Sequence, residues 1–364
     1  MGGHAVHSNT RLNASELMVL AARVQRAMDR VLPVDHRAEP VRFFPGKADH
    51  GDLDVLLACD AFEYAEVLRE ALGATEMVVN RSRKETADPN RQVVSYAVPL
   101  DGDRVFQVDV VQVPARAFDF ARWYFAGNDL GGLLGGVARR LGFKLADVGL
   151  LLEVDDENER VAELAVTRDW DEALAFLGYD PDAYRAGMLE GGFDTLDSLF
   201  AFVASSPYFD PSVYRPENRS GEARRRDANR PTYQAFLRWL DQRGEADPPA
   251  RDVTVLRADA LTRAYRTFPA FARELDELLE GRRRMKKVRQ RFNGHVVAEV
   301  TGLSGPELGA FMCEFQDLLG GPVGVADWVE ARSDAEIRGL LTQLADRWLS
   351  RNDLLNAEVE SGLL

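Results

Sequence analysis

The alternation of apolar and polar residues predicts a strand over residues 52–58. Leu53 and Val55 alternate with Asp52 and Asp54, and apolar residues continue from there to the end of the run. Because successive side chains of a strand point to opposite faces, the two aspartates share one face while Leu53 and Val55 face a core. Two carboxylates this close repel each other unless a cation lies between them, so the pair is either a turn-forming motif or a metal site.

A third acid lies within an apolar strand pattern over residues 105–113. Asp109 stands there among Val and Phe residues, and a charge in such a strand is costly unless it is paired or coordinated. The segment 91–100 also has a strand pattern, and Asp101-Gly102 predicts a hairpin turn between the two strands. We therefore expect Asp109 to lie in the same small sheet as the aspartate pair.

Helical periodicity frames this sheet and dominates the rest of the chain. A helix is expected from Asn13 to about Val31 and another over 61–72, while residues 1–12 are expected to form a loose leader. From residue 118 helices prevail, interrupted by one or two strands over 149–167. This order predicts an α+β fold, in which a small mixed-sheet domain is followed by mainly helical domains.

Three domains are expected, over residues 1–116, 117–250 and 251–364. The central domain is mainly helical with a short strand pair, and the Gly and Pro residues of 244–250 mark a linker after it. The C-terminal domain is helical, with a basic helix and a helical hairpin whose two short helices meet at 302–305.

The composition limits the class of protein. A chain of 364 residues that is 46% hydrophobic can form proper cores, and its net charge of −14 argues against a protein that coats nucleic acid non-specifically. Cys59 and Cys313 lie far apart without metal-ligand spacing, and there is neither a targeting segment nor an apolar run of the roughly twenty residues that a membrane span requires. These features predict a cytoplasmic protein with no membrane partner.

The three acids suggest a particular cofactor. Carboxylate oxygens are the ligands that Mg²⁺ prefers, and two such ions, with Mn²⁺ as the alternative, form the clamp of a two-metal displacement. A P-loop is excluded as a second phosphate site, because Ala48 stands where that motif needs Ser or Thr and Val41 where it needs Gly.

The motif Gly46-Lys47-x-x-x-Gly51-Asp52-Leu53-Asp54, followed further along by Val108-Asp109-Val110-Val111, resembles the nucleotidyltransferases of the DNA polymerase beta superfamily. The resemblance covers residues 39 to 113 and implies a magnesium-dependent transfer of a nucleotide from an NTP to an acceptor hydroxyl. It implies that Asp52 and Asp54 hold both metal ions. Asp109 would bind the ion that activates the hydroxyl and accept its proton, and Gly46 and Lys47 would grip the triphosphate. Lys47 stands where the family usually has Ser.

Two groups of cations are candidate binding residues. Arg139 and Arg140 either reach the triphosphate or lie at the surface. The second group is a helix with an apolar stripe of Met285, Val288 and Phe292, which is either a solvated face or a track for RNA phosphates. Its cations are Arg282, Arg283, Arg284, Lys286, Lys287, Arg289 and Arg291.

The C-terminal hairpin suggests an acceptor. Its Asn293-Gly294 pair and the later Gly302-x-x-Gly305-Pro306-x-Leu308-Gly309 segment resemble the end of bacterial tRNA nucleotidyltransferases and poly(A) polymerases. Residues 118–167 with Phe176–Asp180 resemble predicted nucleotidyltransferases of phages and fungi. These resemblances imply an RNA 3′ end as acceptor, as in tRNA processing. The alternatives are transfer to a small molecule or a protein side chain, and an inactive nucleotide- or RNA-binding module.

Overall fold

The structure is a computed structural model that describes residues 5–44, 46–47, 49–60, 63–81, 92–156, 159–243 and 252–350. It divides into two compact units, residues 1–272 and 273–364. The first two expected domains therefore lie in one unit. The division falls inside helix α11 (Pro269–Arg291) and not at residue 251, because helix α10 (Val253–Thr267) packs on the central helices. For example, Arg263 Nη2 donates to the carbonyl of Phe176 at 2.9 Å.

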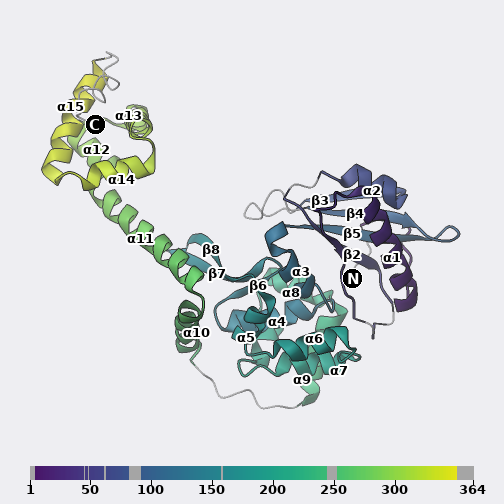
Figure 1. Ribbon diagram of the computed structural model, residues 1–364. Helices are drawn as coiled ribbons and strands as arrows, with labels where there is room; N and C mark the ends of the chain where they lie inside the picture. The colour runs from purple at the N-terminus through teal and green to yellow at the C-terminus, as the bar shows by residue number, and fades with distance from the viewer. Residues whose placement is uncertain are drawn as a thin grey trace. The chain divides into compact units, whose positions relative to one another are not determined.

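The first unit contains a five-stranded mixed sheet with the strand order β1-β2-β5-β4-β3 (Figure 1). Strands β2 and β5 run parallel, and the other neighbours run antiparallel. Both acid-bearing strands predicted from the sequence are confirmed. The strands are β1 (Ala38–Pro40), β2 (Asp52–Ala58), β3 (Glu76–Arg81), β4 (Gln92–Pro99) and β5 (Val105–Val113).

One face of the sheet packs on the helices α1 (Ala14–Val31) and α2 (Ala65–Leu72), with Leu53 and Val55 in the shared core. Helix α1 begins where predicted, because Asn13 forms a capping box: its side chain accepts from the amide of Glu16 at 3.0 Å, and the Glu16 carboxylate accepts from the Asn13 amide at 3.1 Å. This apolar face leaves the aspartates on the opposite face.

The opposite face has two different ends. Towards the C-terminal ends of β2 and β5, Leu56, Val111 and Val113 form an apolar cluster with Phe118 of helix α3 (Phe118–Tyr124). Towards the N-terminal ends of the same strands, the face carries polar side chains. Helix α3 therefore covers only one end of this face.

Residues 5–12, called here the N-terminal strap, lie along the start of β2 and β5. The Thr10 amide donates to the carbonyl of Val105 at 2.8 Å, and Leu12 and His50 exchange two backbone hydrogen bonds of 3.0 and 2.8 Å. The prediction of a loose leader is wrong for these residues, because the strap is fixed by backbone hydrogen bonds to both strand entrances. Residues 1–4 lie outside the described residues.

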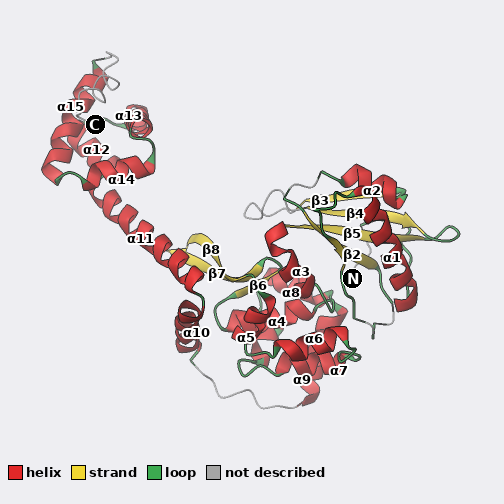
Figure 2. Cartoon of the chain, viewed as in Figure 1, coloured by secondary structure: helices red, strands yellow, loops and turns green. Residues whose placement is uncertain are grey.

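The rest of the first unit is mainly helical (Figure 2). It contains an antiparallel sheet of three strands in the order β6-β7-β8, which confirms strands over 149–167. The elements are α4 (Leu130–Arg140), β6 (Lys144–Ala146), β7 (Gly149–Asp156), β8 (Glu159–Thr167), α5 (Trp170–Phe176), α6 (Pro181–Leu189), α7 (Leu196–Ala204), α8 (Gly221–Ala228), α9 (Pro231–Arg243) and α10, with short 3₁₀ turns at Ala115–Ala117, Pro211–Tyr214 and Pro216–Asn218. Together with the five-stranded sheet, these elements give the mixed α+β fold that the sequence predicts.

The second unit, in its described part, is helical. It consists of the later part of α11 with α12 (Gly294–Thr301), α13 (Gly305–Leu318), α14 (Pro322–Glu330) and α15 (Asp334–Leu349). Val288 and Phe292 are buried in its core and Met285 packs against them, as the apolar stripe predicts. The chain breaks between α12 and α13 where expected, because Gly302 and Gly305 have φ angles of +74° and +55°.

Among the described residues, the helices are all too short or too polar to reach across a lipid bilayer.

Candidate active site

The three predicted acids lie on one face of the five-stranded sheet. Asp54 of β2 and Asp109 of β5 are direct register partners on adjacent parallel strands, and Asp52 pairs with Gln107. Adjacent strands are separated by about 4.8 Å, so Asp54 and Asp109 are cross-strand neighbours. The flanking Leu53 is 2% exposed on the other face, which confirms the alternation predicted from the sequence.

Asp54 is the most perturbed of these acids. Burial raises its pKa to about 8, and the neighbouring carboxylates of Asp52 and Asp109 act in the same direction, while the charge of Lys47 acts against them. Such a carboxyl group holds its proton at neutral pH unless a cation compensates its charge. Ionisation of Asp54 is therefore unfavourable in this site, mainly because the carboxyl is buried, and a bound divalent cation would favour its charged form.

Asp109 is held by two hydrogen-bond donors. Gln107 Nε2 lies 2.9 Å from both Oδ1 and Oδ2 of Asp109, and the Ser95 hydroxyl donates to the same carboxylate. Burial raises the pKa of Asp109, and the hydrogen bonds from Ser95 and Gln107 lower it. The two donors favour the charged form, so they offset part of the cost of burying this acid.

A narrow cavity of about 30 Å³ opens beside the aspartate pair. Its lining includes Asp52, Asp54, Arg42, His50 and Asn128. This volume holds a water molecule and is too small for a nucleotide. A bound nucleotide would therefore have to occupy the solvent side of the acids.

His50 is buried beside this cavity. It is 2% exposed, its Nε2 has no hydrogen-bond partner among the residues that the structure describes, and its ring packs edge-on against Phe43 with 4.7 Å between centroids. Burial lowers its pKa to about 4, with a contribution from the charge of Lys47. The imidazole is consequently neutral at physiological pH.

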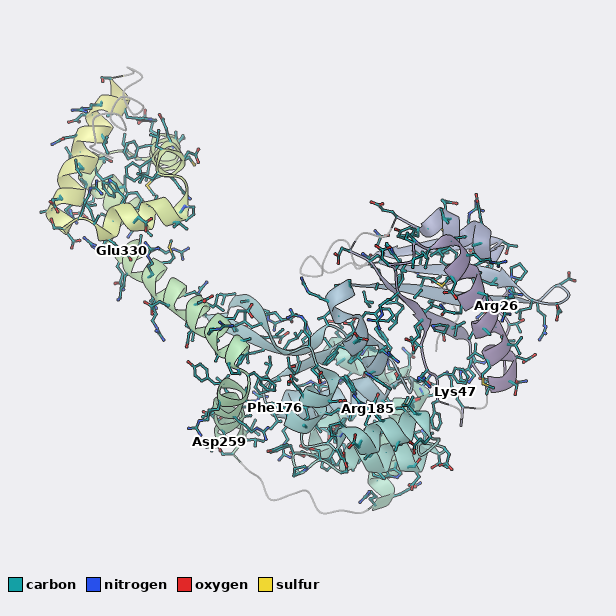
Figure 3. The ribbon with its side chains drawn as sticks, viewed as in Figure 1. Arg26, Lys47, Phe176, Arg185, Asp259 and Glu330 are labelled. Carbon is teal, nitrogen blue, oxygen red and sulfur yellow. The ribbon has the colours of Figure 1, made fainter. Side chains whose placement is uncertain are left out.

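The predicted phosphate-gripping residues lie in the turn before β2. A Cβ at Gly46 would come within 2.6 Å of the Asp194 carbonyl and 2.7 Å of the Phe44 ring, so the glycine is required for close packing on the loop before α7. Lys47 is near enough to Asp54 to influence its pKa, and it is labelled in Figure 3. Ala48 of this motif lies outside the described residues.

The structure does not bring Arg140 to the acids. Its side chain is 6% exposed, Nη1 donates to the carbonyls of Tyr208 and Phe209 at 2.9 Å each, and Nη2 lies 3.1 Å from Asp210 Oδ2. These partners fix the loop after α7 to α4. Arg139 is exposed near the end of α4, and across the described part of the chain no ion pair links either arginine to the three acids.

The seven cations that α11 carries over residues 282–291 differ in their surroundings. Arg284 pairs with Asp327 and Glu330, and Arg291 pairs with Asp334 at 2.6 Å, so both tie α11 to the later helices of its own unit. Glu330 is labelled in Figure 3. Of the others, Arg282 is partly buried, Arg283 is exposed and lies 3.4 Å from Glu280, and three lie exposed: Lys286, Lys287 and Arg289.

The acids suit a divalent cation by donor chemistry, but their present side-chain positions do not enclose one. In the described part of the chain, no three His, Cys, Asp or Glu side chains are arranged to hold a metal ion. The backbone nevertheless places Asp54 and Asp109 in register, with Asp52 on the same face, and side-chain torsions have several accessible rotamers. The unfavourable charge on Asp54 and the shared face both fit a magnesium site formed by rotation of the Asp52 and Asp54 side chains beside a fixed Asp109.

Several residues of the site were missed at the level of sequence. Gln107 stands two residues before Asp109 and therefore on the same face of β5, so alternation could have identified it. Ser95 is the register partner of Asp109 on β4. Asn128, which accepts a hydrogen bond from the Phe44 amide at 2.8 Å and has φ +62°, carries no sequence signal that places it near β2.

A comparison with protein-family models finds no match to this chain, and a comparison with curated proteins finds none either.

Proposed function

We propose that this protein is a magnesium-dependent nucleotidyltransferase, which transfers a nucleoside monophosphate from an NTP to an acceptor hydroxyl. The observation that carries the proposal is the register of Asp54 with Asp109 on adjacent parallel strands, with Asp52 on the same face. The raised pKa of Asp54 supports it, because a site that is strained without a cation is typical of functional carboxylates.

In this proposal each acid has a distinct role. Asp52, Asp54 and Asp109 would hold Mg²⁺, or Mn²⁺, which when bound neutralises phosphate charge and lowers the pKa of a hydroxyl. Asp109 accepts the proton of the acceptor hydroxyl, since its carboxylate is fixed by Gln107 and Ser95. Lys47 supplies a point charge beside the acids for the triphosphate.

The structure gives different support to the nucleotide-binding roles predicted for Gly46 and for the two arginines of α4. Gly46 has a packing function against Asp194, and it would contribute to the nucleotide site through the shape of its turn. Arg140 already has two carbonyls and Asp210 as partners. We therefore assign the triphosphate contact to Lys47 and leave Arg139 and Arg140 outside the site.

The acceptor that we propose is an RNA 3′ end. The exposed cations of α11, which include Lys287 and Arg289, can contact phosphates without reading sequence. Arg284 and Arg291 are excluded from this role, because their ion pairs stabilise the second unit. A tRNA-like acceptor is the specific form of this proposal.

The proposed activity is tested by incubating the full chain with each labelled NTP, Mg²⁺ and total RNA. Label is expected in RNA, and Asp52→Ala/Asp54→Ala should reduce transfer by more than about 1,000-fold, because losing even one charge-stabilising group costs on the order of 100- to 1,000-fold. The matched control is Asp101→Ala/Asp103→Ala, a second Asp-x-Asp pair that lies exposed in the β4–β5 turn. Equal activity of the two double variants would refute the site, and label in protein or small molecules would refute the acceptor.

The RNA surface is tested by salt dependence. Lys287→Ser/Arg289→Ser should weaken RNA binding and reduce the slope of log K against log salt by about 1.4, since each phosphate contact to a single strand contributes about 0.7. Arg26→Ser/Arg30→Ser on α1 removes two exposed cations as a control. The same slope for wild type and both variants would contradict a role for α11.

A further inference from the structure

A continuous series of hydrogen bonds joins the N-terminal strap to Asp109. The amides of Ala5 and Val6 donate to Gln107 Oε1 at 2.8 and 3.3 Å, and Gln107 Nε2 donates to Asp109. The Oε1 atom of Gln107 is thereby held by the strap, which turns its NH₂ group towards the acid. The orientation of this amide is fixed at both ends.

The strap also fixes the backbone of both acid-bearing strands. Asn9 Oδ1 accepts from the backbone N–H of Gln107 at 2.9 Å, and Asn9 Nδ2 donates to the backbone carbonyl of Gly51. Gly51 directly precedes Asp52, so one side chain links the entrance of β2 to β5. A shift of the strap would therefore move the acids relative to one another.

A second donor reaches Asp109 from the opposite side of β5. The side-chain Nδ2 of Asn80 donates to Ser95 Oγ at 3.1 Å. The hydroxyl hydrogen of Ser95 is thus left for Asp109. A carboxylate offers about four lone-pair positions. Asp109 can consequently accept from both Gln107 and Ser95 and still have oxygen lone pairs for a cation or a substrate proton.

Gln112 shows what a purely structural glutamine does on the same strand. Gln107 and Gln112 are each 3% exposed. Both polar atoms of the Gln112 side chain bind backbone groups. Nε2 donates to the backbone carbonyl of Cys59, and Oε1 accepts from the backbone N–H of Gln92, each at 3.2 Å. Gln107 instead directs its donor at a carboxylate, which gives a charge-assisted hydrogen bond.

We propose that Gln107 is a positioning residue for nucleotidyl transfer, which holds the Asp109 carboxylate in its working orientation and is itself held by the N-terminal strap. This inference rests on the proposed function. It adds the strap to the active site, so that a segment far from Asp109 in the sequence controls the geometry of the reacting groups. Groups that orient metal ligands in this way are worth about 10- to 100-fold in metal affinity or activity.

The test compares Gln107→Met with Gln112→Met, which remove the same amide from the same strand at sites of equal burial. Gln107→Met should raise the Mg²⁺ concentration for half-maximal transfer by about 10- to 100-fold and lower kcat, with the KM for NTP less affected. Gln112→Met should lose thermal stability comparably while keeping its Mg²⁺ dependence within about twofold, since it touches none of the acids. Identical Mg²⁺ curves for the two variants would overturn the proposal.

A direct binding measurement separates this inference from the proposed function. Mn²⁺ binding, followed by electron paramagnetic resonance, should weaken in Gln107→Met and, to a smaller extent, in Asn9→Ala, while Gln112→Met and wild type remain alike. If wild type binds Mn²⁺ in this pattern but transfers no nucleotide, the function fails and the positioning role stands. If transfer is intact and Gln107→Met binds Mn²⁺ as wild type does, the positioning role fails alone.

Discussion

The two ends of one sheet face have opposite chemistry. At one end, Leu56 and Val113 pack against Phe118 of α3 and are almost fully buried. At the other, Asp54 and Asp109 lie side by side on the same strands. Asp54 and Leu56 are separated by one residue, so the backbone is common to both ends and only the side chains and their cover differ.

The two ends therefore make opposite contributions to folding stability: the apolar residues increase it and the acids decrease it. Burial of Leu56 removes apolar surface from water and is favourable, whereas burial beside two other carboxylates raises the pKa of Asp54 to about 8. A fold has no need of such an arrangement for its own stability. The acidic end therefore costs stability, and the apolar end of the same strands offsets that cost.

The largest expected effect follows from removing one side chain at each end. Leu56→Ala should lower the free energy of unfolding by about 2–5 kcal/mol, because truncation of a buried leucine loses transfer free energy and leaves a cavity. Asp54→Asn should be more stable than wild type at pH 8 by about 1–2 kcal/mol, because it removes a carboxyl whose ionisation is unfavourable in the folded state. Urea unfolding of the two variants measures both values.

The two variants should rank in the opposite order for nucleotidyl transfer. Leu56→Ala is expected to retain transfer at temperatures where it is folded, while Asp54→Asn loses it. A variant Asp54→Asn that is destabilised as strongly as Leu56→Ala would show that the acid stabilises the fold, and the distinction between the two ends would then be lost.

The sequence is sufficient for the local features of the site. Alternation in 52–58 placed Asp52 and Asp54 on one face, because the side-chain period of a strand is set by its own backbone. The start of α1 was also predictable, since Asn13 and Glu16 form a cap within four residues. Both features depend on neighbours in the chain.

The features that the sequence could not fix depend on distant contacts. Arg140 was a candidate for the triphosphate, but its partners lie in the loop at Tyr208–Asp210, which only the packed helices bring to it. The strap likewise has no periodic pattern, and its order comes from hydrogen bonds to Val105 and His50. Propensity and spacing carry no information about such partners.

The basic helix is intermediate between these cases. Its apolar stripe was predictable from helical spacing, and Val288 is buried as expected. The division of its cations was not predictable, because Arg284 and Arg291 find acids on α14 and α15 that follow later in the chain. A run of like charge in a sequence therefore does not show which of its members are available to a partner.

The smallest expected effect is a fall in the free energy of unfolding between pH 6.5 and 8. We expect a variant at the acidic end to change this pH dependence and a variant at the apolar end to keep it. Asp54 has a folded pKa of about 8, above its usual value, so the folded state binds more protons than the unfolded state over this range. Its stabilising contribution is complete at low pH and is lost as the pH rises through 8. His50 acts oppositely, since its pKa of about 4 makes stability fall as the pH drops below about 6.5. Between pH 4 and 6.5, a rise in pH lowers stability through Asp54 and raises it through His50. Of these two residues, only Asp54 changes the stability above pH 6.5.

Urea unfolding without divalent cations should therefore show wild type losing about 1–2 kcal/mol from pH 6.5 to 8, because a shift of one pKa unit corresponds to about 1.4 kcal/mol. Asp54→Asn should flatten this profile, and Leu56→Ala should keep its slope at a lower overall stability. Saturating Mg²⁺ should also flatten the wild-type profile, because a bound cation favours the ionised carboxylate. If Leu56→Ala and Asp54→Asn alter the slope equally, the pH dependence does not originate in the acidic end of the face, and the raised pKa assigned to Asp54 is wrong.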